Sequence, residues 1–292
     1  ATPTLHGDRL YTLGAAGDLQ CLSTKSGEPI WARKILTENG ARNLQWGLSG
    51  SPLVSDGRVY VTGSGDGGAS ILAFNAVNGE PVWNSDAGVQ SYSSLMHVVL
   101  AGRPQLLNFA GEALNGIDPE SGAVLWSFPW KTDYAINVGQ PILAGDDRVF
   151  IASGYGHGCA LLAIELTDGE LQAHQLWANT RMKNKFTSSV LHDGHIYGLD
   201  ERILACVNLE TGERRWKGGR YSYGSVLLVD DHLLVLGEEG ELALVRATPQ
   251  AHREIGRIQL FDNRTWNNFV LVGATLLARN HKEMVCFDMS GH

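Results

Sequence analysis

The sequence predicts an all-β propeller from three observations: a recurring Gly–Trp turn, evenly spaced short apolar segments and a high glycine content. The turn is short and polar, is closed by Gly and is followed four residues later by Trp; it recurs about every 40 to 50 residues. Its four copies run from Cys21 to Trp31, Ala73 to Trp83, Gly116 to Trp126 and Cys206 to Trp216. A repeat of this period with many tight turns is typical of propeller blades.

Each repeat begins with a strand whose first residues are small or polar. These first strands start at Thr2, Ser51, Ser93, Gln140, Ser188, Ser225 and Asn268. We therefore expect seven blades of four antiparallel strands in a single domain spanning residues 1–292. The repeats lie near residues 1–46, 47–90, 91–136, 137–185, 186–222, 223–265 and 266–292, the last of them incomplete.

A tight turn leads from each first strand to a second strand with a large residue in register. Turns such as Asp56-Gly57 and Asp193-Gly194 suit the positive φ angles of a hairpin. The large residues that follow are predicted to face the core: Tyr11, Tyr60, Phe150, Tyr197, Leu234 and Leu277. The fourth repeat stretches its Gly–Trp turn, and the sixth replaces it with residues 248–253.

The chain opens on a first strand and ends just after a third strand, so the seventh repeat lacks its fourth strand. An unpaired strand edge is a liability that propellers avoid. We therefore expect residues upstream of Ala1 in the natural protein to supply this strand, and an eighth blade in the full-length protein stays open as an alternative.

Composition argues against several classes of partner. The formal net charge is −8 and the pI is near 5.7, so no basic field attracts a phosphate backbone, and nucleic acid is not expected as a partner. No apolar run approaches the roughly 18 residues that a membrane-spanning helix needs. The chain holds 4 cysteines without a Cys-x-x-Cys or zinc-binding pattern, so no metal site is expected.

The Gly–Trp turn resembles the repeat of the pyrroloquinoline-quinone (PQQ) family of propellers. The stretches from Ala73 to Trp83 and from Cys206 to Trp216 resemble that family's pattern Ala-x-Asp-x-x-Thr-Gly-x-x-x-Trp, with Asn at the Asp position in both. The family includes quinoprotein alcohol dehydrogenases and the outer-membrane assembly factor BamB. The resemblance covers nearly the whole chain and implies the propeller fold. It also implies a periplasmic or secreted location in the bacterial envelope, with a signal segment that is not present in this chain.

The resemblance also implies what a quinone site would need. Dehydrogenase members of the family hold PQQ between a Trp and two adjacent cysteines, with Ca²⁺ bound by carboxylates and Asn and with a catalytic Asp. This sequence has no adjacent cysteines. No cofactor is therefore expected.

The loops that join consecutive blades are rich in aromatic, amide and cationic residues. In a propeller such loops crowd one face, where ligands bind. The predicted rim of ligand-binding residues is Trp46, Tyr92, Tyr134, Asn137, Arg181, Lys183, Arg220, Tyr221, Arg264 and Trp266. Aromatic rings and amides of this kind suit a saccharide or a peptide.

We expect a non-catalytic scaffold that binds a protein or a saccharide on this face. A carbohydrate-active enzyme, or a PQQ-dependent dehydrogenase, stays open as the alternative. An enzyme that cleaves polysaccharides needs an acid or base on the rim. Only Tyr92, Tyr134 and Asp133 stand out there, and catalytic residues are not identified.

Overall fold

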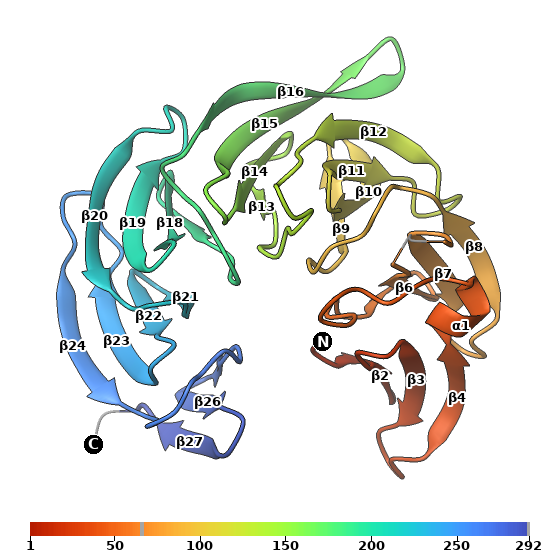
Figure 1. The fold of residues 1–292 in the computed structure, drawn as a ribbon, viewed down its shortest axis with the longest axis horizontal. Helices are drawn as coiled ribbons and strands as arrows, with labels where there is room; N and C mark the ends of the chain where they lie inside the picture. The colour runs from red at the N-terminus through yellow and green to blue at the C-terminus, as the bar shows by residue number, and fades with distance from the viewer. Residues whose placement is uncertain (65–66, 291–292) are drawn as a thin grey trace. The chain divides into compact units, whose positions relative to one another are not determined.

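The computed structural model describes residues 1–64 and 67–290, whose regular secondary structure is almost entirely β-strand (Figure 1). In these residues seven antiparallel sheets follow one another along the chain, each made of strands that are consecutive in sequence. Six sheets have four strands and the last has three. The fold is the predicted seven-bladed β-propeller, and each sheet is one blade.

The first three blades lie in the N-terminal half of the chain. Blade one has β1 (Thr4–His6), β2 (Arg9–Leu13), β3 (Asp18–Ser23) and β4 (Pro29–Lys34). Blade two has β5 (Leu53–Ser55), β6 (Arg58–Thr62), β7 (Ile71–Asn75) and β8 (Pro81–Ser85). Blade three has β9 (Met96–Leu100), β10 (Arg103–Phe109), β11 (Ala113–Ile117) and β12 (Val124–Pro129).

The other four blades follow in the same order. Blade four has β13 (Ile142–Leu143), β14 (Arg148–Ser153), β15 (Gly158–Thr167) and β16 (Glu170–Asn179). Blade five has β17 (Val190–His192), β18 (His195–Asp200), β19 (Ile203–Asn208) and β20 (Arg214–Arg220). Blade six has β21 (Ser225–Val229), β22 (His232–Leu236), β23 (Glu241–Arg246) and β24 (Glu254–Gln259), and blade seven has β25 (Val270–Val272), β26 (Thr275–Arg279) and β27 (Met284–Asp288).

The chain forms two compact units whose boundary passes through blade four. Unit 1 comprises residues Ala1–Val138, Gly145–Val149 and Leu162–His174. Unit 2 comprises Gly139–Ala144, Phe150–Leu161 and Gln175–His292. The sites below each lie within one unit.

One short helix interrupts the described strands. Helix α1 (Ile35–Asn39) follows β4 directly, in a connection where the sequence predicts a loop. Ile35 and Leu36 are buried, and Gly40 ends the helix at φ 65°. In the described part of the chain no helix has the length and apolar character needed to cross a membrane.

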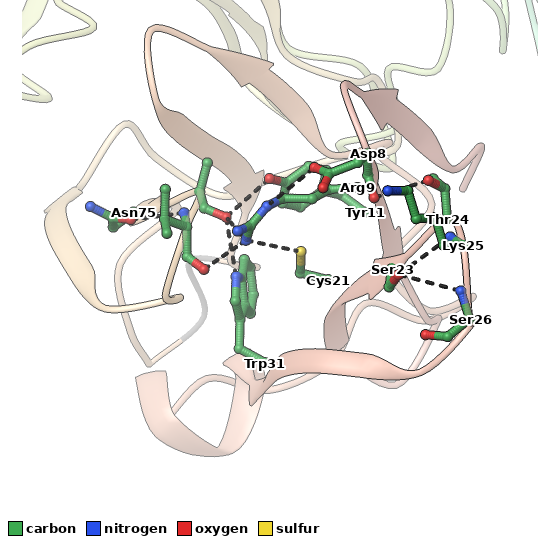
Figure 2. Close-up of polar contacts among 12 residues, drawn as sticks. Asp8, Arg9, Tyr11, Cys21, Ser23, Thr24, Lys25, Ser26, Trp31 and Asn75 are labelled. Atoms are coloured by element: carbon green, nitrogen blue, oxygen red, sulfur yellow. Dashed lines mark hydrogen bonds and ion pairs between the residues drawn. The ribbon is translucent and has the colours of Figure 1, made fainter.

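The Gly–Trp repeat joins neighbouring blades through the indole ring. A Cβ atom on Gly79 of blade two would lie 2.6 Å from Cδ2 of Trp31 in blade one, so only glycine permits this approach. The indole Nε1 of Trp31 donates to the carbonyl of Ala76 at 3.2 Å, and the Tyr11 hydroxyl donates to the same oxygen at 3.0 Å (Figure 2). The Trp31 indole thus packs blade one against the turn of blade two.

The same contact recurs where the next turn keeps its glycine. Trp83 donates to Pro119 O at 3.1 Å and packs on Gly122, and Trp177 donates to Leu209 O at 2.9 Å and packs on Gly212. Trp126 precedes the stretched turn of blade four and instead donates to Gln105 Oε1 within its own blade at 2.6 Å. Loss of the usual turn does not always change the contact, because Trp216 still donates to Thr248 O at 2.7 Å in the replaced turn of blade six.

The predicted first strands begin up to three residues later than expected, because the polar residues before them bond to a neighbouring blade. The Thr2 amide donates to Ser51 Oγ, and the Ser51 amide donates to Ser94 Oγ, both at 2.9 Å. In unit 2 the Gln140 amide donates to Ser188 Oγ at 2.8 Å. These serines connect blades and do not extend strands.

Blade seven departs from the predicted core. The aligned residues Tyr11, Tyr60, Phe150, Tyr197 and Leu234 are buried as predicted, whereas Leu277 is 38% exposed. Leu277 pairs with Cys286, which is exposed too, although Cys21 and Cys206 of the same column are buried. No described strand or blade packs over this face of β26 and β27, so the prediction of a core position was wrong for Leu277.

Candidate functional site

The residues predicted to bind a ligand separate into exposed and buried groups. Trp46, Tyr134 and Trp266 are 63%, 68% and 56% exposed. Asn137 and Tyr221 are fully buried, so a ligand cannot reach their side chains in this structure. Trp46 and Tyr134 belong to unit 1, and Trp266 belongs to unit 2.

The unit 1 loop cluster consists of Trp46, Tyr92, Tyr134 and Asn137. The ring centres of Trp46 and Tyr92 lie 5.9 Å apart with the ring planes tilted by 56°, within the range of favourable aromatic contacts. The Tyr92 carbonyl accepts from Ser49 Oγ at 3.1 Å, and its amide donates to Asn137 O at 3.1 Å. The Tyr92 side chain is therefore attached to fixed backbone, and the Trp46 ring packs against it.

Asn137 is the anchor of this cluster and not a ligand-binding group. Its Nδ2 donates to the Ala110 carbonyl at 2.6 Å, and its amide donates to Ser91 Oγ at 2.6 Å. A buried amide with satisfied hydrogen bonds fixes the path of a loop. Asn184 has the same role in unit 2, where its Nδ2 donates to Leu199 O at 3.2 Å.

Tyr221, which is buried, belongs to a network with partly exposed partners that links the end of β20 to β24. Its hydroxyl donates to Glu254 Oε2 at 2.7 Å and lies 2.9 Å from His252 Nε2. Since the tyrosine has a single proton to donate, His252 Nε2 carries the proton of the second bond. Arg257 binds both oxygens of Glu254 at 3.0 and 2.8 Å and lies over the Tyr221 ring.

Burial and charge shift the pKa values of this network in directions that preserve it. Burial raises the pKa of Tyr221 far above its usual value, so its proton stays in place. Burial also lowers the pKa of His252. The hydrogen bonds from Arg257 hold the pKa of Glu254 below its usual range, and the carboxylate stays ionised. The network joins two blades and engages the Tyr221 hydroxyl in two hydrogen bonds.

The unit 2 loop cluster consists of Tyr155, Lys185, Phe186, Tyr223 and Trp266. The Lys185 ammonium lies 4.5 Å from the ring centre of Tyr223, 4.9 Å from that of Tyr155 and 5.3 Å from that of Phe186. Phe186 in turn contacts the rings of Tyr223 and Trp266 at 5.3 and 5.6 Å. One cation thus gathers aromatic residues from a turn within blade four and from two interblade connections, and Phe186 links them to Trp266 in a third connection.

A polar cavity of about 630 Å³ adjoins this cluster in unit 2. Its wall is formed by Arg202, Glu238, Glu239, Gln259, Asp262, Asn263 and Arg264. The guanidinium of Arg264 lies 4.6 Å from the Trp266 ring centre, and that of Arg202 lies 4.7 Å from the Tyr223 ring centre. Trp266 Nε1 donates to Glu238 Oε1 at 2.8 Å. Residues of the cavity wall therefore contact Tyr223 and Trp266 of the aromatic cluster directly.

The predicted cations Arg181 and Lys183 belong to a different network. Lys183 Nζ lies 2.5 Å from Oδ1 of the buried Asp200, which also pairs with Lys217 and, at 3.8 Å, with Arg214. Arg181 Nη1 donates to the Gly212 carbonyl at 3.0 Å. Arg220 is exposed at the end of β20, where its backbone pairs with Ile203.

Sequence reasoning missed the residues that connect the unit 2 cluster. Phe186 and Tyr223 stand in the interblade segments from which the rim was predicted, beside the chosen positions. Their signal was weak because one aromatic residue in a loop does not reveal whether its ring points outward. Arg202 and Glu238 lie outside these segments, each in a turn between two strands of one blade.

The residues present do not fit a quinone and Ca²⁺ site. The four cysteines are spread over β3, β15, β19 and β27, and three of them are buried. Burial raises the pKa of Cys159 to about 12 and that of Cys206 to about 12, so both thiols stay protonated. Across residues 1–64 and 67–290, no three His, Cys, Asp or Glu side chains gather as metal ligands would.

Comparison with solved structures places the fold among known propellers. BamB from Moraxella catarrhalis matches with a TM-score of 0.69 at 16% identity, over 96% of this chain and 81% of that chain. A europium-containing methanol dehydrogenase matches with a TM-score of 0.66 at 11% identity, over 95% of this chain and 72% of that chain. The computationally designed Ika8 protein matches with a TM-score of 0.56 at 9% identity, over 94% and 91% of the two chains. At these identities the likeness shows the fold alone.

Sequence comparison identifies the family. No curated protein sequence matches the chain. The family model described as outer membrane protein assembly factor BamB matches residues 1–218, about three quarters of the chain. Together with the Gly–Trp contacts between blades, this match shows that the chain belongs to the BamB-like family of PQQ-repeat propellers.

Proposed function

We propose that this protein is a non-catalytic scaffold of the bacterial envelope that binds a protein partner through the unit 1 loop cluster. The family description, an outer membrane protein assembly factor, supports both the envelope location and a role in protein assembly. A saccharide is the other ligand class that the interblade loops suit. The unit 1 cluster favours a protein because it exposes large aromatic side chains.

The observation that carries the proposal is the exposure of large aromatic side chains on anchored loops. Trp46 and Tyr134 leave 63% and 68% of their surface in solvent. Large exposed aromatic side chains mark interaction surfaces, and Trp and Tyr dominate the binding energy of protein interfaces. Asn137 fixes the loop that follows Tyr134 to the backbone of Tyr92. A partner would therefore meet side chains that lose little freedom on binding.

Site-specific photo-crosslinking tests this proposal. A photoreactive phenylalanine analogue is placed at position 46 or 134 of the full-length protein in its native cells. Val99, which is 59% exposed on β9 in unit 1, provides the control position. We expect one discrete protein adduct at positions 46 and 134 and none at position 99.

The outcomes of this experiment separate the ligand classes. An adduct that a protease removes is a protein, whereas a protease-resistant adduct that a glycosidase removes is a saccharide. The proposal fails if positions 46 and 134 give only saccharide adducts, or if they give no adduct beyond that of position 99.

A further inference from the structure

The cavity beside Trp266 has a composition that selects among ligand classes. Its wall residues are all charged or carry amides, and none of them is apolar. Three carboxylates, from Glu238, Glu239 and Asp262, outnumber the two guanidinium groups of Arg202 and Arg264. The wall therefore offers no net positive charge to attract an anion, and no apolar pocket to hold a peptide side chain.

The wall offers hydrogen-bond donors and acceptors side by side. Carboxylate oxygens only accept, guanidinium groups only donate, and the Asn263 amide does both. Gln259 offers its amide oxygen as a further acceptor, because both of its N–H groups are bound to backbone carbonyls. A saccharide hydroxyl both donates and accepts, so one sugar ring can engage all three kinds of group. A neutral saccharide meets this wall without bringing a charge of its own.

Trp266 supplies the apolar element that a sugar ring needs. More than half of its surface, 56%, is exposed, and its N–H is fixed by Glu238 at 2.8 Å. Arg264 lies 3.8 Å from the same Glu238 oxygen and lines the cavity, so the indole and the wall are held together. The C–H face of a pyranose packs on an indole ring, while its hydroxyls point to polar groups around it.

Several wall groups are held before any ligand binds. The Gln259 side chain donates to the carbonyls of Glu239 and Phe261 at 2.8 and 2.7 Å. Asn263 Oδ1 accepts from Lys282 at 3.0 Å, and Arg202 lies over Tyr223. The cavity volume of about 630 Å³ falls within the range of about 300 to 1,000 Å³ typical of small-ligand sites.

We propose that this cavity in unit 2 is a binding site for a neutral saccharide, with Trp266 as the stacking platform. The site is separate from the unit 1 loop cluster and takes a different class of ligand. Its failure would leave the protein-binding proposal standing, and the reverse also holds.

Calorimetric titration with defined probes tests the site. The probes are maltotriose and chitotriose, which are neutral, a hyaluronan tetrasaccharide, which is anionic, and a neutral peptide of similar size. We expect at least one neutral trisaccharide to bind saturably, and the anionic saccharide and the peptide to bind more weakly or not at all. Trp266→Ala should weaken the binding about 10-fold or abolish it.

Matched variants locate the binding. Leu176→Ala alters an exposed residue of unit 2 outside the cavity, 50% exposed on β16, and should leave the affinity unchanged. Asp262→Asn, on the exposed side of the wall, keeps the fold and should lower the affinity through a weaker acceptor. If Trp266→Ala does not fold, the chemical shift of the Trp266 indole proton, assigned through Trp266→Phe, gives the same answer during titration.

Three results would overturn the assignment. The first is that neither neutral trisaccharide binds. The second is that the hyaluronan fragment or the peptide binds more tightly than both of them. The third is that binding persists unchanged in Trp266→Ala, with an indole resonance that does not shift.

Discussion

At the scale of single residues, the contact between Gly79 and Trp31 explains why the repeat needs a glycine. Gly79 has a φ of +74°, and a Cβ atom there would lie 2.6 Å from the Trp31 ring. Gly57 of the same blade has nearly the same φ, +73°, but a Cβ atom there meets nothing within 4 Å. The two positions therefore separate the cost of backbone conformation from the cost of the clash.

Substituting these two glycines should give different losses of stability. Gly57→Ala is expected to cost about 1 to 2 kcal/mol, the price of a left-handed conformation. Gly79→Ala should cost about 1 to 3 kcal/mol more, since the indole of Trp31 must also move. The free energy of unfolding in urea measures both. Equal losses would contradict the account of the indole contact.

The cysteines give a second test at this scale. Cys21, Cys159 and Cys206 are buried, and burial holds the pKa of Cys159 and of Cys206 near 12, whereas Cys286 is exposed. Because the thiolate is the reactive form, one thiol of the native chain should react with Ellman's reagent at about pH 8. Cys286→Ser should remove that reaction. Rapid labelling of more than one native thiol would contradict the buried positions.

The sequence predicted contacts that depend on residue type, and it missed those that depend on side-chain direction. Glycine and tryptophan at a fixed spacing identify the joints between blades, because few other residues could occupy them. The sequence predicted Tyr221 and Asn137 as ligand-binding residues, because aromatic and amide side chains in loops can either bind a ligand or anchor the loop. Their burial follows from the loop's path, which depends on neighbouring blades.

At the scale of structural elements, Asp200 attaches the connection between β16 and β17 to blade five. Its buried carboxylate faces Lys183 from that connection and Lys217 from β20. The side chains of Lys183 and Lys217 are 19% and 26% exposed. The same connection carries Lys185 and Phe186 into the unit 2 loop cluster, so Asp200 helps to position that cluster.

Removing this charge should destabilise the chain strongly. Asp200→Asn leaves the partly buried lysines without a counter-charge, at an expected cost of about 3 to 5 kcal/mol. Asp231→Asn in the same unit affects a carboxylate that is 45% exposed and pairs with Arg246, at a cost of about 0 to 1 kcal/mol. Urea unfolding of both variants measures the difference. Similar losses would show that Asp200 does not anchor the connection.

The Glu254 network makes the junction of β20 and β24 sensitive to acid. The bonds from Arg257 lower the pKa of Glu254 in the folded chain, so the ionised form is favoured by folding. Its stabilisation is complete above the usual glutamate pKa of about 4.3 and is lost as the pH falls through the lower folded value. Glu254→Gln should therefore flatten the fall in stability below about pH 4.3. An unchanged acid profile would contradict this role.

Strand order was predictable from the spacing of the turns, but strand ends were not. The serines and threonines before the first strands look like strand residues, yet Ser51, Ser94 and Ser188 accept bonds from neighbouring blades. Helix α1 follows β4 without a polar N-cap signal, because Lys34 makes no side-chain cap. Such ends are set by tertiary contacts that local propensity does not encode.

At the scale of the whole molecule, the repeat and the family match agree on the fold, and the ligand depends on sites that the fold does not specify. Propellers with one architecture carry unrelated functions, as the matches to a BamB and a methanol dehydrogenase illustrate. The features of this chain that point to a function are therefore Trp46 and Tyr134 in unit 1 and the polar cavity in unit 2. The ligands of these two sites could not be predicted from the amino-acid composition of the loops.

The affinity of the crosslinked partner for purified variants tests the central claim most directly. Trp46→Ala should raise the dissociation constant about 30-fold, the effect of losing an interface anchor worth about 2 kcal/mol, while Val99→Ala leaves it within about 2-fold. An unchanged dissociation constant in Trp46→Ala and in Tyr134→Ala would contradict the claim that the anchored loop aromatics of this propeller bind its protein partner.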